Sequence, residues 1–392
     1  MFAEGAERNK ALGIWGGVGA LGGTVGLLAG GILTTYAGWQ YIFFFNVPIG
    51  AAALVLAPKT VPDSRGPSRP RRYDTFGAVS ITAALLVLVY AISQAPQAGW
   101  AAPRTVAMLA AGVALSAVFL VVETKVEAPL LPLPLLRLSS VAGSNAVGFL
   151  LGASFNTFVF LGTLYMQQVL GLSALATGAA WMTASVTSLA CACAGLSQRM
   201  VTRTSAKPVM AFGMALVGAG ILWAAQAPVN GNFWPDLAGP FFIAGIGTAF
   251  AFIPVSIGAL TGVTERNAGV ASGLLNTSQT FGAAIGVAVA SSIAASRSRA
   301  LLHHGYATAA ALTGGLHLAI GVCGLTGLAA IPVAFVLIRR RSSIPLVGKE
   351  DEAVTDGPAA GQAERLGASG LSEQALAGPD HDRKDEQPQL IH

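Results

Sequence analysis

Charged residues are scarce in this sequence. Asp, Glu, Lys and Arg make up 10% of its 392 residues, whereas about a quarter of a soluble domain is charged. Hydrophobic residues make up 53%, and they gather in runs that match the roughly 20 apolar residues a helix needs to span a bilayer. The composition excludes an ordinary soluble domain and predicts an all-α polytopic membrane protein.

Carboxylates are missing from the middle of these runs. Of the 18 Asp and Glu residues, ten follow Lys349, and the other eight lie in expected loops or at the ends of expected spans. Acidic residues within the membrane are common proton relays of pumps and antiporters. The spans therefore lack an obvious proton relay, and we interpret His317, which lies within the last span, as a packing residue.

Patterns that would indicate an enzyme are also missing. The sequence has no Gly-rich phosphate loop ending in Lys-Ser or Lys-Thr, so ATP is not an expected partner. It has no Ser/His/Asp set and no His/Glu set with metal-ligand spacing, so we expect no catalytic residue, no metal and no cofactor. The three cysteines lie within apolar runs, where we expect them to be small packing residues. Basic and aromatic residues are not interleaved on a solvated surface, so nucleic acid is not an expected partner either.

Ten apolar runs remain as candidate membrane spans. They are Leu12–Leu33, Gln40–Pro58, Thr75–Gln94, Val106–Val122, Val141–Met166, Thr177–Ser197, Lys207–Gln226, Leu237–Leu260, Gly269–Ala290 and Thr313–Ile338. The segment Ser296–Leu312, which contains His303 and His304, is expected to be a loop. The sequence after Lys349 is rich in Ala, Gly, Gln and acids, so we expect a disordered tail.

Basic residues are distributed unevenly between the two sides of this topology. With ten spans, both termini lie on one side, which receives seventeen Lys and Arg residues up to Lys349, while the other side receives Arg104, Arg297 and Arg299. Because the excess of Lys and Arg lies in cytoplasmic loops, we expect both termini in the cytoplasm. The basic linker Lys59–Asp74 is then either a solvated loop or a contact for anionic membrane lipid.

A short polar signature occurs twice and precedes a small-residue helix each time. Its copies are Glu7-Arg8-Asn9 and Glu265-Arg266-Asn267, with eight predicted spans between them. Together with the segments Gly38–Gly50, Pro129–Leu133 and Tyr165–Ser173, this arrangement resembles the major facilitator superfamily and, within it, the fourteen-helix drug:proton antiporter branch. The resemblance implies a secondary active transporter of the bacterial cell membrane. Its expected cargo is drugs, antibiotics or other small apolar or cationic molecules, and the proton is its candidate coupling ion.

The repeat also implies how the chain relates to that fold. The ten spans would correspond to helices five to fourteen, without the first four. The expected parts are residues 1–58, a remnant of the N-terminal bundle with two helices; residues 59–140, a linker with two inserted helices; residues 141–340, a six-helix C-terminal bundle; and residues 341–392, a disordered cytoplasmic tail. Because one bundle would hold two of its six helices, we do not expect coupled transport by these residues alone. A truncated, non-transporting remnant and a helix-packing partner of another membrane protein are the alternatives.

A glycine pattern in the first span predicts close helix packing. Gly22, Gly26 and Gly30 recur at every fourth residue and share one helix face, with Gly23 and Gly31 beside them. Small residues at this spacing let helix backbones approach closely in lipid. The run resembles the antiporter motif of the superfamily, Gly-x-x-x-Gly-Pro-x-x-Gly-Gly, with Leu27 in place of the proline.

Polar side chains within spans are the candidates for a substrate pathway. Asn145 and Asn156 are eleven residues apart, close to three helical turns, and are expected to share a face. The remaining candidates are Tyr165, Gln168, Asn276 and Gln279. We expect an apolar wall from some of the aromatic residues Phe155, Phe158, Phe160, Trp181, Phe241, Phe242, Phe250 and Phe252.

Overall fold

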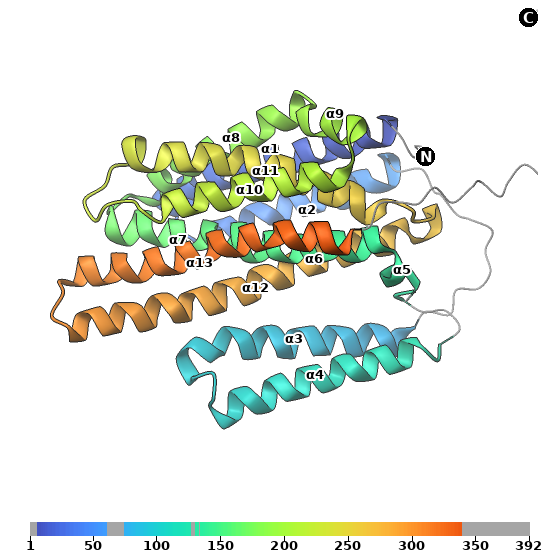
Figure 1. The fold of residues 1–392 in the computed structure, drawn as a ribbon, viewed down its shortest axis with the longest axis horizontal. Helices are drawn as coiled ribbons and strands as arrows, with labels where there is room; N and C mark the ends of the chain where they lie inside the picture. The colour runs from blue at the N-terminus through green and yellow to red at the C-terminus, as the bar shows by residue number, and fades with distance from the viewer. Residues whose placement is uncertain (1–5, 61–73, 127–129, 133, 339–392) are drawn as a thin grey trace, which may run out of the picture. The chain divides into compact units, whose positions relative to one another are not determined.

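The computed structural model describes residues 6–60, 74–126, 130–132 and 134–338 (Figure 1). Every regular element in these ranges is helical, which confirms the predicted all-α architecture. In chain order the elements are α1 (Ala6–Tyr36), α2 (Gln40–Thr60), α3 (Thr75–Ala98), α4 (Pro103–Glu123), α5 (Pro134–Arg137), α6 (Ser139–Leu151), η1 (Gly152–Asn156), α7 (Thr157–Leu164), η2 (Tyr165–Val169), α8 (Ala174–Cys193), α9 (Leu196–Arg203), α10 (Ala206–Ala224), η3 (Phe233–Leu237), α11 (Ala238–Leu260), α12 (Glu265–His303) and α13 (Thr308–Leu337).

Nine helical segments within the described residues are long and apolar enough to cross a membrane. They coincide with nine of the ten predicted spans, although their bounds differ by several residues. The remaining span, Leu12–Leu33, falls within α1, where the apolar run Leu21–Tyr36 is shorter than the other nine. The expected tail and most of the basic linker lie outside the described residues.

Both polar signatures lie at the start of a helix. The first lies in the opening turn of α1, and the second begins α12 at Glu265. The prediction of a loop at Ser296–Leu312 is wrong, because α12 continues to His303. Its Ser, Arg, Ala and Leu residues are tolerated in helices, and the break comes only at Gly305, whose φ of 84° favours glycine.

The core lies around α10, which packs against both α11 and α13. Met210, Met214, Val217 and Ile221 project from it and are completely buried. A Cβ atom added to Gly213 would collide with the α11 backbone at Phe250. Since lipid supplies no hydrophobic force between helices, such close backbone contacts are a main source of their association.

Helix α12 packs against α6 and η1 through similar close contacts between glycines and the facing backbone. A Cβ atom on Gly152 would collide with the Gln279 carbonyl, and one on Gly282 would collide with the Phe149 carbonyl. The side-chain oxygen of Asn145 on α6 accepts a hydrogen bond from the Ser278 hydroxyl on α12 at 2.9 Å. Backbone contact and a polar interhelical bond therefore fix the position of α12 beside η1.

The α3–α4 pair and helix α2 lie at the edges of this packing. Helices α3 and α4 pack side by side and contact α12 through α3 (Figure 1). A hydrogen bond of 2.9 Å from the Trp100 indole nitrogen to the Ser292 hydroxyl adds to this contact. Helix α2 contacts α1, and none of its residues is buried.

Candidate functional site

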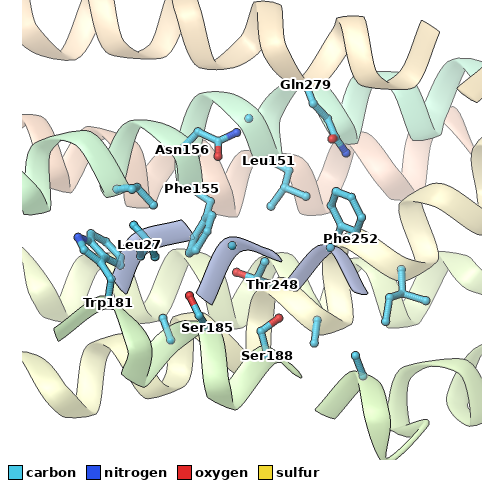
Figure 2. Close-up of a pocket in the computed structure, with 18 residues that line it drawn as sticks. Leu27, Leu151, Phe155, Asn156, Trp181, Ser185, Ser188, Thr248, Phe252 and Gln279 are labelled. Atoms are coloured by element: carbon cyan, nitrogen blue, oxygen red, sulfur yellow. The ribbon is translucent and has the colours of Figure 1, made fainter. Parts of the chain in front are cut away.

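A cavity of about 380 Å³ lies between helices that are far apart in the sequence. Helices α1, α8 and α11 contribute to it, as do α6, η1, α7 and α12. Figure 2 shows the labelled side chains converging on this space from several directions. Its volume falls within the range of small-molecule sites, which is about 300–1,000 Å³.

The side chains that line the cavity are uncharged and mostly apolar. Its aromatic members are Phe155, Trp181 and Phe252, and its aliphatic members are Leu27, Leu151, Val159, Ala184, Ala192, Ala249 and Ile253. Its polar members are Asn156, Ser185, Ser188, Thr248 and Gln279, and Gly19, Gly23 and Gly152 complete the lining. A few oriented polar groups on an apolar wall are typical of small-molecule sites.

Asn156 reaches the cavity from the end of the π-helical turn η1. A π-helical turn closes its hydrogen bonds between residues i and i+5, so it holds one residue more than an α-helical turn, and it is often found at functional sites. The Asn156 side chain is exposed, whereas the preceding Gly152, Ala153 and Ser154 are buried. The turn therefore presents one amide to the cavity while its other side packs against neighbouring helices.

Trp181 forms a fixed aromatic wall on α8. Its ring stacks on Phe241 with centroids 4.3 Å apart, and Phe158 meets it edge-on at 5.4 Å. Its indole nitrogen donates a hydrogen bond of 3.0 Å to the Thr163 hydroxyl. Trp181 is only 2% exposed, so its neighbours hold the ring in place where it lines the cavity.

Gln279 supplies a second amide from α12, opposite α8. Its backbone carbonyl contacts Gly152, and its neighbour Ser278 is bonded to Asn145, so the helix is held rigidly at this point. The Nε2 atom of Gln279 is buried and has no hydrogen-bond partner in the described structure. An unpaired amide donor is costly to bury.

Comparison with known proteins identifies the family of the chain. Residues 1–287 match the family description Major Facilitator Superfamily. The chain belongs to the major facilitator superfamily. As a member of this superfamily with several helices that fit a bilayer, it is an integral membrane protein.

Curated relatives of this superfamily member include antibiotic exporters. The chain is 31% identical over 354 residues to the puromycin resistance protein of Streptomyces alboniger, with 87% of this chain and 69% of the relative covered. It is 34% identical to the cephamycin export protein of Amycolatopsis lactamdurans, covering 74% of this chain and 60% of the relative. It is 30% identical to the tetracenomycin C resistance and export protein of Streptomyces glaucescens, covering 74% of this chain and 54% of the relative. The chain thus spans between about a half and 69% of the length of these relatives.

Two of the six polar residues predicted for the substrate pathway line the cavity. They are Asn156 and Gln279. Gln168 and Asn276 are exposed and lie outside the lining, although Asn276 is on the same helix as Gln279. Of the eight aromatic residues considered for an apolar wall, Phe155, Trp181 and Phe252 line the cavity.

Asn145 and Asn156 do not share an environment, contrary to the sequence prediction. Asn145 is 8% exposed and hydrogen-bonds to Val141 and Ser278, whereas Asn156 faces the cavity. The prediction assumed an unbroken α-helix between them. The π-helical turn η1 inserts a residue and changes the direction of every side chain that follows.

Tyr165 is also outside the cavity. Its side chain is 2% exposed, and its hydroxyl donates a hydrogen bond of 2.6 Å to the Pro228 carbonyl in the segment after α10. Its ring lies 6.0 Å from that of His317 on α13. Tyr165 therefore joins η2 to the segment after α10 and to α13.

Of the glycines predicted to form the packing face of α1, Gly31 alone makes a close contact with another described helix. A Cβ atom on Gly22, Gly26 or Gly30 would meet no other described atom within 4 Å. The adjacent stripe makes the contacts: Gly19, Gly23 and Leu27 line the cavity, and Gly31 packs against α8. A Cβ atom on Gly178 of α8 would lie 2.7 Å from the Leu27 carbonyl, and one on Gly31 would lie 3.0 Å from the Ala174 carbonyl.

The sequence analysis missed the hydroxyl groups of the site. Ser185 and Ser188 lie on α8 at spacings of four and seven residues from Trp181, so they share its helix face. That spacing was a usable signal once Trp181 was considered as a wall. Thr248 on α11 completes the set, and its hydroxyl also hydrogen-bonds to the Ala244 carbonyl.

Proposed function

We propose that this transporter binds small apolar or cationic molecules in the cavity and exports them across the bacterial cell membrane, with the proton as coupling ion. The observation that carries the proposal is the composition of the cavity wall, which combines aromatic rings with the amides of Asn156 and Gln279. The names of the relatives, which refer to puromycin, cephamycin and tetracenomycin C, support export of antibiotics or similar compounds.

The wall chemistry defines the class of ligand. Phe155, Trp181 and Phe252 provide apolar surface for a planar or bulky ligand. The faces of aromatic rings also attract cations, by about 0.5–2 kcal/mol. Because all the described side chains in the lining are uncharged, an anion would lose its hydration without gaining an opposite charge. The cavity should therefore prefer neutral and cationic aromatic molecules to anionic ones.

Efflux from whole cells tests the export part of the proposal. Cells that produce the 392-residue chain are loaded with a fluorescent aromatic cation, and its loss is followed with and without a protonophore. The proposal differs here from the expectation drawn from a two-helix N-terminal bundle. It predicts faster loss than in vector cells, and this difference should disappear when the proton gradient is collapsed. Asn156→Ala should slow the loss, whereas Asn276→Ala, which changes an amide outside the cavity, should not.

Ligand binding to the purified protein separates the two parts of the proposal. Binding without gradient-dependent efflux would support the cavity as a ligand site and would contradict export by the chain alone. Efflux that survives the protonophore would contradict the proton as coupling ion. Absence of both binding and efflux would contradict the proposed function as a whole.

A further inference from the structure

A second cluster of polar groups lies outside the cavity, at the open end of the α3–α4 hairpin. Asp74 immediately precedes α3, and Glu123 is the last residue of α4, so the two lie at the end opposite the turn at Gly99 (Figure 1). Asp74 is 8% exposed and Glu123 is 3% exposed. Carboxyl groups are rarely buried this deeply unless they are paired.

Each carboxyl group uses one oxygen to bind the backbone. Asp74 Oδ1 accepts a hydrogen bond of 2.7 Å from the Gly77 amide and caps α3. Glu123 Oε1 accepts a hydrogen bond from the Leu131 amide, in the segment that leads to α5, and the Leu130 amide also acts on this carboxyl group. The opposite oxygens, Asp74 Oδ2 and Glu123 Oε2, are buried and have no hydrogen-bond donor in the described structure.

The two carboxyl groups interact with each other. An ionised carboxylate only accepts hydrogen bonds, so two of them in contact repel each other and leave these oxygens unsatisfied. Asp74 is the charged group that acts on Glu123, while the basic residues Lys125 and Arg137 on the adjoining segments are exposed. Arg71, Arg72 and Glu127 lie outside the described residues.

A single proton resolves this arrangement. It turns one carboxyl group into a donor to the other, satisfies both remaining oxygens and removes one of the two charges. We propose that Asp74 and Glu123 form a proton-binding site that holds one proton between them. The bound proton joins the start of α3, the end of α4 and the Leu130–Leu131 segment; without it, repulsion weakens this junction. This inference does not rest on the proposed export function.

Infrared difference spectroscopy of the purified full-length protein tests the proton directly. Ordinary Asp and Glu carboxyl groups ionise near pH 4. We expect the carbonyl-stretch band of a protonated carboxyl group to persist well above that pH in the wild type. Glu123→Gln and Asp74→Asn should each remove this band, because either amide can donate to the remaining carboxylate. The control Asp236→Asn, which alters a half-buried carboxyl group far along the chain, should retain it.

Thermal unfolding gives a second readout. The folded protein holds the proton more tightly than the unfolded chain, so stability should be present at low pH and fall as the pair deprotonates. Glu123→Gln imitates the protonated group and should fold with a smaller dependence on pH. The proposal is overturned if the wild type shows no persistent carboxyl band, or if the band survives in both pair variants. It is also overturned if sodium or calcium ions displace the band at constant pH, because the pair would then be a metal-cation site.

Discussion

The ring of Trp181 stacks on that of Phe241 with centroids 4.3 Å apart and planes inclined by 25°. The contact joins α8 to α11, and Trp181 also lines the cavity. Because Trp181 belongs both to the cavity wall and to the helix packing, its substitution should change stability and ligand binding together.

Trp181→Phe should keep most of the packing, whereas Trp181→Ala should not. Removing a buried Trp side chain costs about 3–5 kcal/mol, so Trp181→Ala should lower the thermal unfolding temperature in detergent markedly. Trp181→Phe loses the hydrogen bond to Thr163, which costs about 1 kcal/mol, and retains an aromatic face. Equal unfolding temperatures for the Ala variant and the wild type would contradict the assigned packing.

Glycines that contact the backbone of a facing helix should tolerate substitution less well than glycines on the stripe of α1 that makes no such contact. Gly31→Leu and Gly178→Leu place a side chain against the backbone of the facing helix, and overpacking of this kind costs about 1–3 kcal/mol. Both variants should accumulate less in the membrane and unfold earlier in detergent. Gly26→Leu is the matched control, since no described atom lies within 4 Å of the added Cβ. A larger loss for Gly26→Leu than for Gly31→Leu would restore the face predicted from the sequence.

These glycines also show what the sequence could predict. The spacing of four indicated a helix with a small-residue face, and α1 has one. Two stripes offset by one residue fit that spacing equally well, and the choice depends on α8, whose Ala174 and Gly178 lie far along the chain. A pattern within one helix carries no information about which stripe a distant helix covers.

Asn156 and Asp74 illustrate two other limits. The sequence identified Asn156 as a candidate, but its orientation depends on the π-helical turn η1, and no residue type marks such a turn. Asp74 and Glu123 were recognised as residues at span ends, yet their contact exists only because α3 and α4 pair side by side. Helix positions follow from apolar runs, whereas contacts between helices require the assembled fold.

The distribution of basic residues predicts the orientation of the chain. We expect a cysteine at position 68 in the basic linker to react with a membrane-impermeant thiol reagent only after the cells are opened. A cysteine in place of His304, in the turn between α12 and α13, should react in intact cells. Both are made after Cys191, Cys193 and Cys323 have been replaced by alanine. Labelling of position 68 in intact cells would reverse the orientation.

The affinity of the cavity for a ligand is the most direct test of the central claim. We would measure the dissociation constant of ethidium, an aromatic cation with amino groups, on the purified 392-residue protein. Asn156→Ala and Gln279→Ala each remove a hydrogen-bonding group worth about 0.5–1.5 kcal/mol, so each should weaken binding by roughly 2- to 10-fold. Asn276→Ala, three residues before Gln279 and outside the cavity, should leave the affinity unchanged. Unchanged affinity in both cavity variants, or an equal loss in Asn276→Ala, would contradict the assignment of this cavity as the ligand site.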